Sequence, residues 1–306
     1  MHKPVLLKEA IAGLNLNEES VVVDATLGGG GHSSEILKMI GSKGGLIAID
    51  RDAKAVENFR EKNDNINLIL INDNFSNIKK ILKENGIEEV DAILADFGLS
   101  SDQLDNSERG FSFLSDADLD MRMDRSQKLT AVDVVNYYSE EELKKILWEY
   151  GEEKYAPMIA RKIVENRIKK PIEKVSELVS LIESSVPEEY KKGKIHFATK
   201  TFQALRIEVN DELNSINKFL KGAISILKPG GRLVTIAFHS GEDRITKNTF
   251  KNFEKGCICP PEFPVCRCGK KSLISIITKK PIVASEEEIR ENPRARSAKM
   301  RIVEKK

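Results

Sequence analysis

Four short apolar runs alternate with helical stretches over the first 96 residues, and this rhythm constrains the fold more than any other feature. Each run is rich in Val, Ile and Leu and almost continuously apolar, as expected of strands covered on both faces. Strands that alternate with helices build a mostly parallel sheet through right-handed crossovers. The expected strands are 21–26, 45–50, 66–72 and 91–96, and the expected helices between them are 33–40, 53–61 and 76–84.

A mostly helical block follows Asp96 and interrupts the rhythm. The string SEEE at 139–142 is a capping box that opens a helix, and further helices are expected over 155–167 and 175–185. A long helical stretch over 199–227 then precedes the turn KPGG and the strand GRLVTIAF, while SLISIITK and AKMRIVEK predict an antiparallel pair at the sheet edge. We therefore expect an α/β domain made of residues 1–103 and 197–306, with a helical insertion over 104–196.

Composition excludes several classes of protein. Hydrophobic residues make up 40% and charged residues 32%, the balance of an ordinary soluble globular chain. Because 49 basic residues oppose 48 acidic ones, no global field attracts nucleic acid or an anionic membrane, so any such attraction must come from local patches. No apolar run approaches the length of a membrane span and the N-terminus has no leader pattern, so we expect a cytoplasmic protein without a membrane partner.

The first strand runs into the string LGGGGHSS, which then opens a helix. Consecutive glycines at such a place mark a loop where the backbone turns sharply or a ligand approaches closely. A dinucleotide fingerprint, G-x-G-x-x-G, has Ser33 instead of its third glycine when counted from Gly28. The frame Asp24-x-x-x-Gly28-x-Gly30 fits better, and it is similar to the first motif of Rossmann-like methyltransferases.

Asp50 closes the second strand, at the place from which an acidic side chain reaches the ribose hydroxyls of an adenosyl nucleoside. Its two oxygens can accept hydrogen bonds from both hydroxyls, although capping the next helix is an alternative role for Asp50 or Asp52. S-adenosylmethionine carries a sulfonium cation and no phosphate, so Asp24 beside the loop attracts it and repels a pyrophosphate. The sequence therefore favours a methyltransferase over a nucleotide-dependent oxidoreductase.

Longer strings carry a family resemblance that runs nearly end to end. They are HKPVLLKEAI, DATLGGGGHS, AIDRD, DFGLSSDQLD, ERGFSF followed by LDMRMD, YGEEKYAPMIARKIVENR, FATKTFQALRIEVNDEL, KPGGRL, FHSGEDR and ENPRARSAKMR. Together they resemble the bacterial small-subunit (16S) ribosomal RNA cytosine-N4 methyltransferases. Gly241 departs from the family string FHSLEDR, which has leucine there, and a cysteine cluster is carried by only some members.

The resemblance implies an α/β fold with a Rossmann-like S-adenosylmethionine-dependent methyltransferase domain and a set of cofactor-binding residues. These residues are Gly30, Gly31, His32, Asp50, Phe75, Asp96 and Gln103, to which the glycine frame adds Gly28. Phe75 follows the third strand, where an aromatic face can cover an adenine, but it is equally a core residue of the next helix. His32 has the alternative role of a helix-start residue. Asp96 ends the fourth strand, at the edge where ligands of open α/β sheets bind.

Methyl transfer to nitrogen is an in-line displacement that depends on alignment of donor and acceptor and needs no metal, so we expect no metal in the methyl-transfer site. The lone pair of cytosine N4 is delocalised into the ring, and a hydrogen-bond acceptor on the amino group would localise it. Asp96, in the string DFGL, is the first candidate for this catalytic role. His239, in AFHSGED, is the second, with a buried structural histidine as the alternative.

The resemblance also implies a partner, namely 16S ribosomal RNA or the small ribosomal subunit, with no DNA expected. We expect the insertion to serve the RNA, whose target base must be turned out of its stack to reach a methyl donor. Basic runs at 161–170, 190–200 and 292–301 can contact phosphates, but each is equally a solvated surface. A non-catalytic RNA-binding protein with a retained nucleotide pocket is the rival hypothesis, and the intact glycine loop, Asp50 and Asp96 argue against it.

The four cysteines lie close together near the C-terminus, which argues against a dispersed disulfide framework. They are Cys257, Cys259, Cys266 and Cys268, in the pattern C-x-C, six residues, C-x-C. Four thiolates can bind zinc, but zinc sites more often use C-x-x-C, so reduced or redox-active thiols remain an open alternative. A zinc ion here would be structural and remote from methyl transfer.

Overall fold

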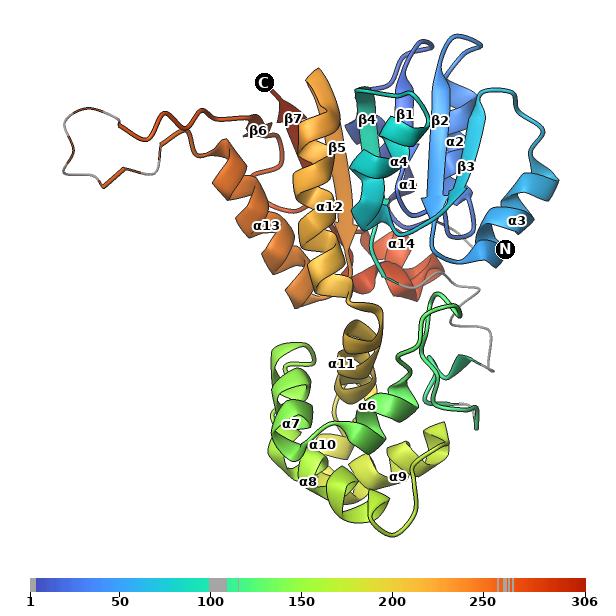
Figure 1. The fold of residues 1–306 in the computed structure, drawn as a ribbon, viewed down its shortest axis with the longest axis vertical. Helices are drawn as coiled ribbons and strands as arrows, with labels where there is room; N and C mark the ends of the chain where they lie inside the picture. Colours follow the sequence, from blue (N-terminus) through green and yellow to red (C-terminus); the bar gives the residue numbers. More distant parts are fainter. Residues whose placement is uncertain are drawn as a thin grey trace. The chain divides into compact units, whose positions relative to one another are not determined.

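The expected strands pair into a mostly parallel seven-stranded sheet in the computed structural model of the chain (Figure 1). The structure describes residues 4–98, 109–114, 116–257, 259, 260, 263, 265 and 267–306. The strand order is β3-β2-β1-β4-β5-β7-β6. The strands are β1 (Val21–Asp24), β2 (Gly45–Asp50), β3 (Leu68–Asn72), β4 (Val90–Asp96), β5 (Leu227–Ala237), β6 (Ile274–Ile276) and β7 (Lys299–Lys305).

Strands β1 to β5 are parallel, whereas β7 runs antiparallel to both β5 and β6. The prediction of an α/β, Rossmann-like sheet is therefore confirmed, as is the antiparallel pair at its edge. From β1 the chain moves outward to β2 and β3, and from β4 it moves the other way to β5. The boundary between β1 and β4 is thus a topological switch point, and open α/β sheets bind ligands outside the carboxyl ends of the strands there.

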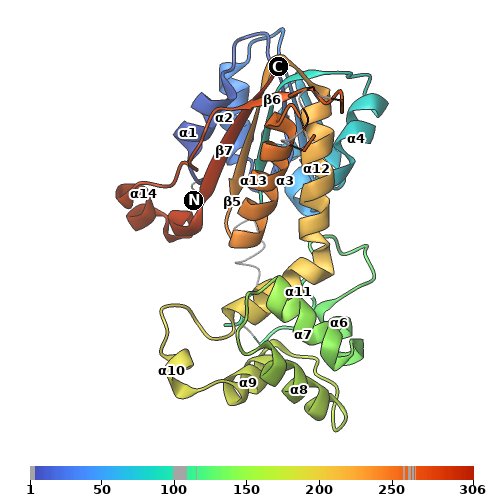
Figure 2. The ribbon, with the colours of Figure 1, turned by 90° about the vertical axis from the view of Figure 1, so that its left-hand side faces the viewer.

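Helices cover both faces of the sheet, which explains the continuously apolar strands. Successive strand residues point to opposite faces, so Val22 and Val23 belong to two different clusters of the core. Helices α1 (Leu7–Leu14), α2 (Gly31–Met39) and α3 (Ala53–Lys62) pack on one face, and α4 (Ile78–Glu84), α12 (Glu212–Ile226) and α13 (Ser240–Glu254) pack on the other (Figure 2). Between β6 and β7 lie α14 (Glu286–Glu291) and the 3₁₀ helix η3 (Pro293–Ser297).

The chain divides into two compact units, Met1–Leu99 with Leu213–Lys306, and Ser100–Glu212. The second unit is helical, and its helices are α6 (Ala131–Tyr137), α7 (Glu140–Glu149), α8 (Ala156–Arg167), α9 (Val175–Ser185), α10 (Glu188–Lys191) and α11 (Thr199–Asn210). The sequence assigned α11 to the sheet domain, but Gln203 on α11 donates to the carbonyl oxygen of Tyr150 at the end of α7, at 2.9 Å. Among the described residues, no helix is both long and apolar enough to span a bilayer.

The helical stretch expected over 199–227 is confirmed, and it consists of two helices. Helix α11 ends at Asn210, and Asp211 adopts a left-handed conformation with φ of 47° before α12 begins. Aspartate is one of the few residues other than glycine that visits this conformation routinely. The expected KPGG turn interrupts β5, whose pairing with β4 jumps from Val90–Leu227 to Ala92–Arg232.

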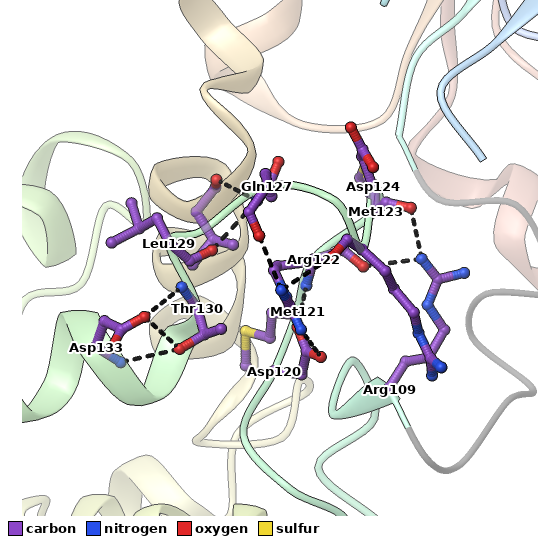
Figure 3. Close-up of polar contacts among 12 residues, drawn as sticks. Arg109, Asp120, Met121, Arg122, Met123, Asp124, Gln127, Leu129, Thr130 and Asp133 are labelled. Carbon is purple, nitrogen blue, oxygen red and sulfur yellow. Dashed lines mark hydrogen bonds and ion pairs between the residues drawn. The ribbon is translucent and has the colours of Figure 1, made fainter. Parts of the chain in front are cut away.

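A loop of the second unit carries the string LDMRMD and is held by its own side chains (Figure 3). Arg109 is 7% exposed and donates to the carbonyl oxygens of Arg122 and Met123 at 2.8 and 2.6 Å. Arg122 pairs with Asp120 at 2.7 Å, and the Asn210 side chain accepts the Met123 N–H at 2.8 Å. The buried guanidinium is thus compensated by backbone carbonyl groups, as buried polar groups must be.

Candidate active site

Polar side chains gather at the carboxyl edge of the sheet, where β1, β2, β4 and β5 end. Asp24, Asp50 and Asp96 are the last residues of β1, β2 and β4, and His239 follows β5 by two residues. The register places Asp24 beside Leu94 of β4, and Asp96 beside Ile236 of β5. Residues far apart in the sequence are therefore brought together on both sides of the switch point.

The glycine loop between β1 and α2 owes its glycines to backbone shape and close packing. Gly28 and Gly30 have φ of 49° and 75°, where side chains are strained. A Cβ atom on Gly30 would lie 2.1 Å from the ring of Phe59, and one on Gly31 would lie 2.2 Å from Cγ of Pro4. The loop is therefore rigidly seated against the rest of the unit.

Asp50 holds this loop in place. Its Oδ2 accepts the Gly28 N–H at 2.7 Å, and its Oδ1 accepts the Asp52 N–H at 2.8 Å. Asp52 is the residue that caps α3, by accepting the N–H of Lys54 at 3.1 Å, so the capping role considered for Asp50 is wrong. Burial raises the pKa of Asp50. A carboxylate has about four acceptor sites, so these two bonds leave Asp50 able to accept from a ribose.

Asp24 is buried, and each of its oxygens has a hydrogen-bond partner within the protein. Its two oxygens accept hydrogen bonds from the Ser33 hydroxyl at 2.6 Å and from the Thr26 N–H at 3.1 Å. Burial raises its pKa, and the two hydrogen bonds partly offset this effect. Ser33 occupies the position of the missing third glycine, so the departure from the dinucleotide fingerprint has a physical reason. The serine ties α2 to the end of β1.

Asp96 differs from the other two carboxyl groups. Its N–H donates to the Thr26 hydroxyl at 2.7 Å, but its Oδ1 is buried and has no hydrogen-bond partner among the described residues. Burial raises its pKa well above the usual value, and the negative charges of Asp24 and Glu242 raise it further. The side chain of Asp96 as a whole is 21% exposed, although its Oδ1 atom is buried.

His32 lies beside this carboxyl group. Its Nε2 is 3.1 Å from the carbonyl oxygen of Val5 and must donate to it, since a carbonyl oxygen only accepts. Its Nδ1 is 3.8 Å from Oδ2 of Asp96. A neutral ring that donates through Nε2 turns its Nδ1 lone pair toward Asp96, whereas a protonated ring would form an ion pair with this carboxylate.

His239 caps α13. Its Nδ1 accepts the N–H of Gly241 at 3.2 Å, and its Nε2 lies 3.2 Å from Oε1 of Glu242. A Cβ atom on Gly241 would approach the imidazole to 3.1 Å, so the departure from the family string leaves this ring more room. Sequence reasoning missed Glu242, which is buried and accepts the backbone N–H groups of Phe238 and His239 at 2.7 and 3.2 Å. The sequence pattern that could have identified Glu242 is a capping box, in which a glutamate follows the capping residue, here His239, by three positions.

Phe75 begins a 3₁₀ turn, η1 (Phe75–Asn77), and contacts the core only in part. Its ring centroid is 6.0 Å from that of Phe97 and 5.3 Å from that of Phe219. The guanidinium carbon of Arg51 lies 5.6 Å from the same centroid. Phe75 is therefore a half-buried contact of the core, and its role over an adenine stays a prediction. Gln103 lies outside the described residues.

These features define a methyltransferase that uses S-adenosylmethionine. They are the sheet, the acidic strand ends, and a glycine loop in which Ser33 replaces the third glycine of the dinucleotide fingerprint. The model of the MraW methylase family matches residues 1–306, and the chain belongs to that family. The predicted family, enzyme class and cofactor are thereby confirmed, and the oxidoreductase alternative is wrong.

The chain shares about half of its residues with curated relatives. The chain is 53% identical to "Ribosomal RNA small subunit methyltransferase H" of Caldicellulosiruptor bescii, over 99% of each chain. It is 49% identical to the protein of the same name from Brevibacillus brevis, over 99% of this chain and 98% of that one. Among solved structures, an rRNA methylase from Streptococcus thermophilus aligns over 100% of this chain and 98% of its own, with a TM-score of 0.43 and 10% identity.

Proposed function

We propose that this chain transfers a methyl group from S-adenosylmethionine to the N4 amino group of a cytosine in 16S ribosomal RNA. The proposal rests on relatives named for small-subunit ribosomal RNA methylation. They align with 99% of this chain, and about half of the aligned residues are identical. The unpartnered carboxyl oxygen of Asp96 supports the choice of an amino group as the methyl acceptor.

The cofactor site in this proposal lies along the carboxyl edge of β1, β2 and β4. Gly28, Gly30 and Gly31 shape the loop, Asp50 accepts from the ribose, and Phe75 offers its ring to the adenine. His32 and Gln103 complete the set that the family resemblance implies. When bound, S-adenosylmethionine supplies an electrophilic methyl group next to a sulfonium. The buried carboxyl groups favour that cation, because a positive charge stabilises their ionised forms.

Asp96 is assigned the central role in catalysis. Its carboxylate accepts a hydrogen bond from the N4 amino group, which localises the nitrogen lone pair for attack. A carboxylate with a raised pKa also takes up the proton that the methylated nitrogen must lose. His239 is assigned a positioning role, since its Nδ1 is engaged with the helix backbone and its Nε2 faces Glu242 rather than open space.

The second unit is proposed to bind the RNA. Lys170 is paired with Glu177, and Arg301 in the sheet unit is paired with Asp243, so these members of the basic runs have protein partners. Lys192 and Lys194 are exposed, in a segment where His196 stacks on Phe113 with ring centroids 4.4 Å apart. Exposed cations next to aromatic rings match the contacts that proteins use on single-stranded RNA.

Mass spectrometry of ribosomal RNA tests the reaction. We expect a cytosine of 16S RNA to lose one methyl group in cells that lack the chain and to regain it when the chain is restored. Comparison of the released nucleoside with N4-methyl and C5-methyl standards identifies the methylated atom. Unchanged 16S methylation in the deleted strain would refute the proposal.

Replacement of Lys192 and Lys194 by glutamine tests the RNA surface. We expect weaker RNA binding and a salt dependence that is shallower by about two counter-ions, because each phosphate contact releases about one. Cofactor affinity should not change. The matched control replaces Lys38 and Lys43 of the sheet unit, which pair with Glu35 and Glu19. Equal effects of the two double variants would remove the segment from the RNA surface.

A further inference from the structure

The chain between α13 and β6 makes a long excursion from the sheet unit, and it carries the cysteines (Figure 1). The described residues between Glu254 and Ile274 form no helix or strand. Phe263 and Val265 are 48% and 69% exposed, so the apolar side chains described here do not form a core of their own. Small segments without a core are commonly held by disulfides or by a metal ion.

Three cysteines converge in this excursion. The Sγ atoms of Cys257, Cys259 and Cys268 all lie within 4.8 Å of one another. Those of Cys257 and Cys268 are 3.8 Å apart, well beyond a disulfide bond length of about 2.05 Å. A tetrahedral zinc ion with Zn–S bonds of about 2.3 Å separates its sulfur ligands by about 3.8 Å. The sulfur spacing therefore suits a shared metal ion.

Backbone N–H groups point at two of the sulfur atoms. The N–H of Cys259 donates to Sγ of Cys257 at 3.4 Å, and the N–H of Arg267 donates to Sγ of Cys259 at 3.3 Å. Such bonds stabilise the negative charge that a metal-bound thiolate keeps, and they orient the ligand. This arrangement is independent evidence for a built site, because it does not follow from proximity of the cysteines alone.

We propose that Cys257, Cys259 and Cys268 bind one zinc ion that fixes the excursion to the sheet unit. Cys257 lies three residues after the end of α13. Lys270 donates to the Asn252 carbonyl oxygen at 2.6 Å. The metal ion and this hydrogen bond would therefore join the two ends of the excursion next to α13. Cys266 offers a fourth thiolate in the sequence and lies outside the described residues.

The role of the ion is structural. Helix α13 has 15 residues and therefore spans about 22 Å, with His239 at its first end and the cysteines beyond its last. The metal site is thus too far along the helix to take part in methyl transfer. Zinc fits better than a cubane iron–sulfur cluster, in which each thiolate binds a different iron atom and the sulfur atoms are spread farther apart.

Metal analysis of the full-length reduced protein tests the proposal. We expect one zinc per chain in the protein as isolated, and loss of that zinc when Cys257, Cys259 and Cys268 are all replaced by serine. Replacement of zinc by cobalt should give the visible absorption bands of a tetrahedral cobalt thiolate. The matched control, Ser272→Ala, lies in the same excursion and should keep both the zinc and the cobalt bands.

Two further measurements separate the metal site from general unfolding. The triple serine variant should keep its helical circular dichroism and its S-adenosylmethionine affinity, while proteases should cut it faster between Glu254 and Ile274. Reduced wild-type protein that binds neither zinc nor cobalt would overturn the proposal. Iron with acid-labile sulfide, or disulfides that form in preference to zinc binding, would overturn it as well.

Discussion

The two halves of the carboxyl edge of the sheet treat their acidic residues in opposite ways. At β1 and β2, Asp24 and Asp50 each accept two hydrogen bonds from the protein. At β4, the Oδ1 atom of Asp96 is buried without a partner in the described part of the chain. An unsatisfied buried acceptor costs free energy, so a fold tolerates it where a ligand or a reaction uses it. In the function proposed above, the half at β1 and β2 binds the cofactor, and the half at β4 takes part in the chemistry.

Asp96→Asn should have the largest effect on this contrast. Asparagine keeps the size and a carbonyl acceptor but cannot take up the proton of the amino group, so we expect the methyl-transfer step to slow by about a hundredfold or more. Cofactor affinity should fall much less. Single-turnover assays with saturating cofactor and RNA measure that step directly.

A carboxylate at the other end of the same strand provides the control for this variant. Asp91 accepts the Val21 N–H and pairs with Lys228, so Asp91→Asn should leave the single-turnover rate near that of the wild type. A large loss of cofactor affinity with a near-normal saturated rate in Asp96→Asn would make Asp96 a cofactor ligand only. The remaining candidates to face the amino group would then be His239 and the backbone carbonyl groups around Phe97 and Gly98.

Asp50→Ala should act on binding instead of rate. Loss of charge-assisted hydrogen bonds to the ribose and to the Gly28 N–H should cost roughly 2 kcal/mol and so weaken S-adenosylmethionine binding by about thirtyfold. Calorimetry measures this affinity. Asp52→Ala removes only the cap of α3 and should cost about 1 kcal/mol of stability with little change in affinity. Equal affinities of Asp50→Ala and wild type would remove Asp50 from the site.

The sequence was sufficient for the parts of the fold that depend on local pattern. Strand β2 and helix α9 have the bounds that their apolar periodicity predicts, and Asp50 and Asp96 follow from their places at strand ends. The break at Asp211 could not be predicted, since no glycine or proline marks it and both neighbouring segments are good helix formers. The boundary between the two compact units at Glu212 could not be predicted either, because it depends on contacts between residues distant in sequence.

Charge environment was the other part that the sequence could not supply. The motifs identified Asp24, Asp50 and Asp96 as acidic strand ends, but they do not show which hydrogen bonds each carboxyl group accepts. Which of them keeps an unpartnered oxygen depends on Ser33, Thr26 and Gly28, whose donors reach the other carboxyl groups only in the folded chain. The chemical difference between the two halves is therefore a tertiary property.

Ser33→Ala tests the contrast from the other side, because it should leave Asp24 with an unpartnered oxygen, as Asp96 has. It leaves the buried Oδ2 of Asp24 without its hydroxyl donor, so we expect a loss of about 1–3 kcal/mol in the free energy of unfolding. Ser34→Ala is the control, because that hydroxyl bonds only to the Gly30 carbonyl oxygen within the same turn and should cost within about 0.5 kcal/mol. Denaturant unfolding of the cofactor-free proteins compares them, and equal losses would contradict the special role of Ser33.

The smallest effect expected is on the pH dependence of stability. Burial and the charges of Asp24 and Glu242 raise the pKa of Asp96 well above its usual value, so the folded state binds this proton more tightly than the unfolded state. The contribution of Asp96 to stability is therefore present at low pH and is lost as the pH rises through the raised pKa. Asp96→Asn removes this titration, while Asp24 and Asp50 titrate in both proteins. At neutral pH the cofactor-free variant should melt higher than the wild type, by roughly 2–4 °C per kcal/mol gained in a chain of this size. That advantage should shrink as the pH is lowered toward the ordinary pKa of an aspartate, whereas parallel melting curves across pH would show that Asp96 is not held in an unfavourable charged state.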